Sequence, residues 1–149
     1  MKKLLAVLSA ATLMTTLAAC GAAGTAGVSS AASEPASAGE AAYRVAIVQQ
    51  MDHASLDEIR TAIEAELDAK AAAGTAVEYK VFNGQNDATT LNQIGTQIVS
   101  DGYDAVIPIA TLAAQCMATA CEPTGTPVIY AAISDPAAAD LTGIDYVTG

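Results

Sequence analysis

The chain has 149 residues, a formal net charge of −10 and a hydrophobic content of 52%, with no tryptophan and a single histidine. This length accommodates one small domain, and the acidic balance argues against nucleic acid as a partner and against polybasic docking on anionic lipid. Much of the apolar content is alanine, so the core is expected to be built from small side chains that each bury little area.

The first 20 residues have the pattern of a secretory signal. Lys2 and Lys3 precede an apolar run, residues 4–17, that is too short to span a membrane. The run leads into Leu-Ala-Ala-Cys20, which resembles a bacterial lipoprotein box, whose cysteine is lipidated and becomes the first mature residue. The resemblance implies a lipid anchor on Cys20 and a location on the extracytoplasmic face of the cell membrane. Without the signal the chain keeps four basic and 16 acidic residues, a net charge of −12.

Residues 21–42 are rich in alanine, glycine and serine and contain no large apolar side chain. Such a segment cannot bury enough apolar area to fold, so it is expected to be a flexible tether. The folded part is therefore expected to be residues 43–149.

From residue 43 on, short β-rich runs alternate with segments of helical periodicity. Strands are expected at residues 44–48, 77–82, 105–109 and 128–131, and helices at 55–73, 88–100 and 111–120. Asp135-Pro136 is expected to open a short helical turn, and residues 141–147 to begin a fifth strand. Right-handed crossovers make this order an α/β, Rossmann-like doubly wound parallel sheet with strand order 2-1-3-4-5.

The ends of the two longer helices can be assigned from single residues. Ser55 is expected to cap the first helix and Asp87 the second, because both types accept hydrogen bonds from first-turn N–H groups. Gly74 and Gly102 follow the last periodic residues and are expected to end these helices. The inward faces are expected to carry Leu56, Ile59, Ile63 and Leu67 in the first helix and Leu91, Ile94 and Ile98 in the second.

Polar loops follow four of the expected strands. In doubly wound sheets ligands bind outside the carboxyl ends of the strands, where these loops lie together. The candidate ligand-binding residues in them are Gln50, His53, Asn86, Thr111, Leu112, Ala113, Ser134 and Asp135.

Each candidate also has a plainer structural interpretation. Thr111 can hold a ligand carboxylate with its hydroxyl, helped by the N–H groups of Leu112 and Ala113 at a helix start, or it can be only an N-cap. Ser134 and Asp135 can bind an ammonium group or carry the crossover to another domain, or they can form a turn and cap before a proline.

The first two loops carry the remaining candidates. Gln50 and His53 lie in the first loop, and His53 is expected at the rim and not as a zinc ligand, because no second histidine or cysteine pair has ligand spacing. Asn86 can offer a polar contact to a ligand. No metal or cofactor is expected, and without a nucleophile elbow, phosphate loop or cofactor fingerprint the chain is not expected to be an enzyme.

Cys116 and Cys121 leave two alternatives open. A disulfide is plausible in an oxidising compartment, but it requires the third helix to unwind near Thr119, because five positions along a regular helix place side chains well apart. The other alternative is two small buried thiols.

Several stretches together resemble the lipoprotein substrate-binding components of ABC importers with the type I periplasmic-binding fold. The matching stretches are VAIVQ (45–49), HASLD (53–57), ATTLNQI (88–94), IAT with AAQ (109–115) and AAISDP (131–136). The resemblance implies a solute-binding component for a small molecule, an amino acid, working with an ABC permease and an ATPase. The alternatives are a ligand-sensing lipoprotein that signals to a receptor and an inactive fragment.

The chain departs from that family in length, because family members have two lobes that enclose the ligand between them. The sequence is therefore expected to be the first lobe alone: a fragment, a truncated gene product or half of a split gene. An expected consequence is weak binding, because half of the clamp is missing.

Overall fold

The computed structural model describes residues 43–149. The signal, the lipobox cysteine Cys20 and the expected tether lie outside the described residues. Within residues 43–149 no helix has the length and apolar character needed to cross a membrane.

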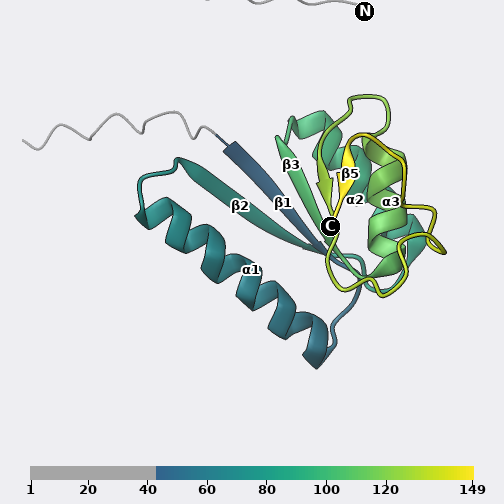
Figure 1. Cartoon of the computed structure of the whole chain (residues 1–149), viewed down its shortest axis with the longest axis horizontal. Coiled ribbons are helices and arrows are strands. Elements are labelled where there is room, and N and C mark those ends of the chain that lie inside the picture. Colours follow the sequence, from purple (N-terminus) through teal and green to yellow (C-terminus); the bar gives the residue numbers. More distant parts are fainter. Residues whose placement is uncertain (1–42) are drawn as a thin grey trace, which may run out of the picture. The chain divides into compact units, whose positions relative to one another are not determined.

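Five parallel strands form one sheet in the order β2-β1-β3-β4-β5 (Figure 1), which confirms the predicted topology. β1 pairs on both sides, with Val45 opposite Tyr79 of β2 and Ala105 of β3. The strands are β1 (Tyr43–Gln49), β2 (Val77–Asn83), β3 (Ala105–Ile109), β4 (Val128–Ile129) and β5 (Val147–Thr148).

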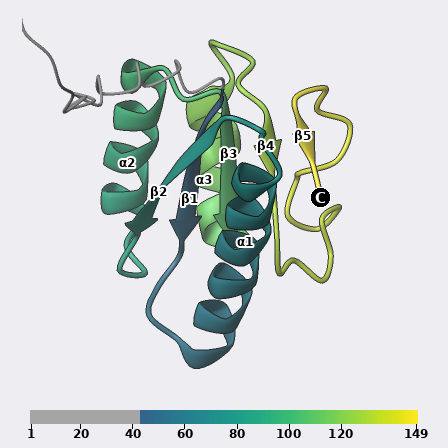
Figure 2. The same cartoon turned by 90° about the vertical axis from the view of Figure 1, so that its left-hand side faces the viewer.

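Three helices cover the sheet: α1 (Ala54–Ala72), α2 (Ala88–Asp101) and α3 (Thr111–Cys121). On β1, Ala46 and Val48 belong to the core that contains residues of α2 and α3, whereas Gln49 bonds to side chains of α1. Successive strand residues point to opposite faces. Hence α2 and α3 share one face of the sheet and α1 lies on the other (Figures 1 and 2).

The main core lies between the sheet and the α2–α3 pair. Leu91 and Ile98 of α2 are fully buried and Ile94 packs against them, as predicted from the helical spacing. Met117 of α3 and Val106 of β3 complete the centre of this core with no exposed surface. This layer therefore anchors the loops that follow β2 and β3.

The opposite layer is less well covered. No residue of α1 is buried, and its predicted inward residues are only half-buried: Leu56, Ile59, Ile63 and Leu67. The helix is the only one described on this face of the sheet, and Val81 and Ile129 remain 38% and 37% exposed. A polar network holds α1 instead: Gln49 donates to Asp57 (2.8 Å) and accepts from Arg60 (2.9 Å).

Of the two predicted helix caps, one is confirmed and one is wrong. Asp87 caps α2 as predicted, because its carboxylate accepts the Thr90 N–H at 2.7 Å. Ser55 does not cap α1. The cap is His53, whose Nδ1 accepts the Ser55 N–H at 3.3 Å, so the helix begins one residue earlier than predicted.

The C-terminal part has shorter elements than the sequence suggests. β4 was predicted to reach residue 131, but it ends at Ile129, and Ala131 makes only a single bridge to Ile109 before Ala132 turns with a positive φ of 60°. Residues after Pro136 form turns and no helix, and β5 is confined to two residues.

Candidate functional site

The loops after β1, β2, β3 and β4 meet at the carboxyl edge of the sheet, here called the rim. Backbone hydrogen bonds join them in series: Gly84 N–H to the Gln49 carbonyl (2.8 Å), Gln50 N–H to the Ile109 carbonyl (3.2 Å) and Ala110 N–H to the Ala131 carbonyl (3.0 Å). The structure therefore confirms the prediction that these four loops lie together.

The side chain of Gln50 bridges two other parts of the rim. Its amide nitrogen donates to the side-chain oxygen of Asn86 at 2.9 Å. Its amide oxygen accepts the backbone N–H of Leu112 at 3.0 Å. Three of the predicted site residues, from three loops, are thus in direct contact, but the Leu112 N–H that was expected to face a ligand is already used within the protein.

The rim concentrates unusual backbone conformations. Among the described residues five non-glycine residues have positive φ, and four of them lie in rim loops: Gln85 (53°), Asn86 (56°), Ala110 (78°) and Ala132 (60°). Ala110 combines its φ with a ψ of 162°, a region that almost only glycine adopts. Such residues store strain that the surrounding structure must hold, and they cluster at functional sites.

The N-terminus of α3 opens onto this rim. Its N-cap is Ala110, which offers no side-chain cap, so the alternative in which Thr111 is the N-cap is wrong. Thr111 is the first helical residue and its side chain is exposed, whereas Ala113 is buried. Because first-turn N–H groups lack helical partners and carry the positive end of the helix dipole, this end favours an anion.

The other predicted site residues lie at the rim in different settings. His53 is exposed but is used as the cap of α1. Asp135 accepts the Ala138 N–H at 3.0 Å, which is the turn-and-cap arrangement that was left open. Ser134 is exposed beside it.

Two polar groupings near the rim were not predicted. The Asn83 amide donates to the Asp52 carboxylate, linking the first two loops. Gln49 is 2% exposed and donates to the Met51 carbonyl at 2.7 Å in addition to Asp57. A glutamine at the end of a buried apolar strand must find hydrogen-bond partners, and that was the signal for Gln49.

The cysteines of α3 are free thiols in the structure, the second of the two alternatives. The helix continues regularly through Thr119, so the unwinding that a disulfide requires is absent from α3. Burial raises the pKa of Cys121 to about 11 and raises that of Cys116 in the same direction. Within residues 43–149 no group of three or more histidine, cysteine, aspartate or glutamate side chains could hold a metal ion.

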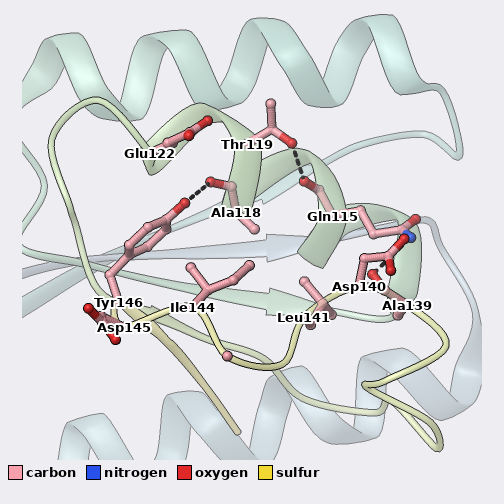
Figure 3. Close-up of a pocket in the computed structure, with 11 residues that line it drawn as sticks. Gln115, Ala118, Thr119, Glu122, Ala139, Asp140, Leu141, Ile144, Asp145 and Tyr146 are labelled. Atoms are coloured by element: carbon pink, nitrogen blue, oxygen red, sulfur yellow. Dashed lines mark hydrogen bonds between the residues drawn. The ribbon is translucent and has the colours of Figure 1, made fainter.

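A pocket of about 620 Å³ lies away from the rim, between α3 and residues 139–146 (Figure 3). Its wall includes Tyr146, whose hydroxyl donates to the Ala118 carbonyl at 3.0 Å, and Gln115, which donates to the Ala139 carbonyl at 3.1 Å. Leu141 forms part of the floor. This pocket and the polar, strained rim are therefore different places, and of the two the rim joins loops from four strands.

A doubly wound parallel sheet with polar, strained loops at its carboxyl edge is the architecture of an α/β ligand-binding lobe. Residues 44–145 match the family described as ABC transporter substrate binding protein. The chain belongs to this family. It is 32% identical over 98 residues to a tyrosine-binding protein of Clostridioides difficile (strain R20291), a match that covers 65% of this chain and 28% of that protein.

Solved structures of similar proteins have the same lobe. An ABC domain from Streptococcus pneumonia in complex with L-Trp is 34% identical, with a TM-score of 0.60, over 66% of this chain and 33% of that one. A ligand-free, open substrate-binding protein with adhesive properties from Clostridium difficile is 30% identical, with a TM-score of 0.61, over 68% and 34%. The chain thus spans about a third of the length of these relatives.

Proposed function

We propose that this chain forms one lobe of an extracytoplasmic amino-acid-binding component of an ABC importer, with the ligand at the rim. The observation that carries the proposal is the α3 N-terminus, which opens onto the rim with an exposed Thr111 and receives no side-chain cap from its own N-cap residue, Ala110. Similar proteins are described as tyrosine-binding and as an L-Trp complex, which supports an aromatic amino acid as the ligand class.

In this proposal the ligand carboxylate lies at the start of α3. The Thr111 hydroxyl and first-turn N–H groups donate to it, and the helix dipole favours its charge. The ammonium group faces Ser134 and Asp135, while Asn86 and His53 supply polar contacts from the neighbouring loops. These residue types bind a zwitterion without a cofactor or a covalent step.

The rim is one wall of a two-walled site in this proposal. Further polypeptide, corresponding to the rest of the longer relatives, supplies the second wall, and hinge closure encloses the ligand. A permease and an ATPase carry out transport. The single lobe leaves its ligand in contact with water, so we expect only millimolar affinity from residues 43–149.

The exposed threonine of α3 provides the test. Thr111→Val keeps the shape of the side chain and removes the hydroxyl donor, so L-tryptophan should bind more weakly by about 1.5–3 kcal/mol, the range for hydrogen bonds to charged groups. Thr119→Val is the matched control, because Thr119 is also exposed on α3 and its hydroxyl bonds within the helix to the Gln115 carbonyl at 3.0 Å. Equal affinities of the two variants, measured by titration, would remove Thr111 from the site.

The membrane location is a separate part of the proposal. Cys20 in its lipobox context supports an acyl anchor, which would hold the lobe at the extracytoplasmic face of the cell membrane. Cys20→Ala should move the protein from the membrane fraction to the soluble fraction of a bacterial host. Retention of the variant on membranes would contradict the lipoprotein assignment.

A further inference from the structure

We infer that the side chain of Gln50 is a latch on the α3 N-terminus, which a carboxylate opens by replacing the glutamine amide oxygen. The inference rests on the proposed function, because it concerns how the same rim selects its ligand. Its basis is the pair of hydrogen bonds that Gln50 makes, to Leu112 N–H at 3.0 Å and to Asn86 at 2.9 Å.

The two bonds hold the amide in one orientation. The Asn86 side-chain oxygen can only accept, so it requires the nitrogen end of the Gln50 amide, and the oxygen end is then directed at Leu112. The Asn86 backbone is itself fixed, because its N–H donates to the Gln50 carbonyl at 2.8 Å. The latch therefore has a rigid support on the neighbouring loop.

A carboxylate can replace the neutral amide oxygen of Gln50 as the acceptor of the Leu112 N–H. A carboxylate makes shorter and stronger hydrogen bonds to N–H groups than a neutral acceptor does, and the helix dipole adds to its preference. A neutral ligand gains no such advantage and must still break both Gln50 bonds. Gln50 thereby favours ligands with a free carboxylate.

The test records the backbone amide signal of Leu112 in the full chain by NMR while sodium acetate is titrated, with sodium chloride as the ionic-strength control. In Gln50→Ala the freed N–H should bind acetate about 2- to 12-fold more tightly than in the unaltered chain, the equivalent of one net hydrogen bond. In Gln50→Glu a fixed carboxylate occupies the N–H, so acetate should no longer shift the signal.

Two further variants control for indirect effects. Asn86→Ala removes the support of the latch, so its acetate affinity should lie between that of the unaltered chain and that of Gln50→Ala. If Gln50→Ala does not fold, Asn86→Ala serves as the readout. Gln97→Ala changes an exposed glutamine of α2, whose amide lies 3.4 Å from Asp101. Its acetate affinity should equal that of the unaltered chain. Acetate affinity that is unchanged or lower in both Gln50→Ala and Asn86→Ala would overturn the inference.

The same spectra separate this inference from the proposed function. A Leu112 signal that responds to acetate as expected in the variants, while L-tryptophan shifts no rim signal in any of them, would support the latch and count against amino-acid binding. L-tryptophan binding at the rim with a Leu112 signal that never responds to a carboxylate would overturn the latch alone.

Discussion

Asp87 determines both where α2 begins and how its stability depends on pH. Its carboxylate accepts the Thr90 N–H at 2.7 Å and the Thr90 hydroxyl at 2.9 Å. Both bonds stabilise the charged carboxylate and lower the pKa of Asp87, and the backbone bond has the larger effect. The cap therefore contributes fully to the stability of the fold at pH values above the pKa of an unfolded aspartate. This contribution is lost as the pH falls through the lower pKa that Asp87 has in the folded chain.

Asp87→Ala should lower the melting temperature at pH 7 by a few degrees, because the first turn of α2 loses its acceptor. Asp87→Asn is the matched variant, since it keeps an oxygen at the cap but cannot titrate. The difference in melting temperature between the unaltered chain and Asp87→Asn should shrink from pH 7 to pH 3, as measured by circular dichroism. A difference that stays constant would show that Asp87 titrates normally.

Local chemistry explains which residue roles the sequence predicts. Asp87 lies three residues before the N–H that it caps, so the sequence alone indicates the bond. Gln50 and Leu112 are 62 positions apart, and only the folded sheet brings them together. The positive φ of Ala110 and Ala132 has no sequence signal at all, because alanine does not favour that conformation.

At the scale of elements, α2 and α3 form the closest helix contact of the described residues. Gly95 of α2 is buried where the two helices meet, and a β-carbon built there would lie 2.6 Å from the Ala120 β-carbon and 3.2 Å from the terminal methyl carbon of Met117. The missing side chain therefore permits the helices to approach and the core to close.

Gly95→Ala should destabilise the fold by about 1–3 kcal/mol through overpacking, even though alanine is the better helix former. Thr96→Ala, at the exposed neighbouring position, should change the free energy of unfolding by no more than about 0.5 kcal/mol. Urea unfolding of both variants measures the difference. A stabilising Gly95→Ala would mean that the two helices are farther apart than in the structure.

Periodicity predicts elements well where one layer buries them. The inward residues of α2 and the bounds of β3 follow the sequence because the α2–α3 layer buries the centre of that face, including Val106 and Ile98. The same periodicity in α1 correctly predicts a helix but overestimates its burial, since within residues 43–149 no second helix lies on this face of the sheet. Short edge strands such as β5 have too few residues to show a pattern.

At the scale of the whole molecule, the topology could be predicted and the completeness of the site could not. The strand order follows from alternating elements and right-handed crossovers. In the proposed function the binding surface also needs side chains opposite the rim, and the chain spans only about a third of the length of its relatives. The central claim is accordingly that this rim recognises an amino-acid carboxylate at α3.

Titration of the chain with L-tryptophan and with tryptamine, which is the same molecule without the carboxylate, tests this claim most directly. Backbone amide spectra should show shifts from L-tryptophan gathered in the loops at residues 50–53, 83–87, 110–113 and 132–135, at millimolar affinity, while tryptamine leaves residues 111–113 unchanged. Equal shifts of residues 111–113 by both compounds, or L-tryptophan shifts confined to the pocket beside residues 139–146, would contradict it.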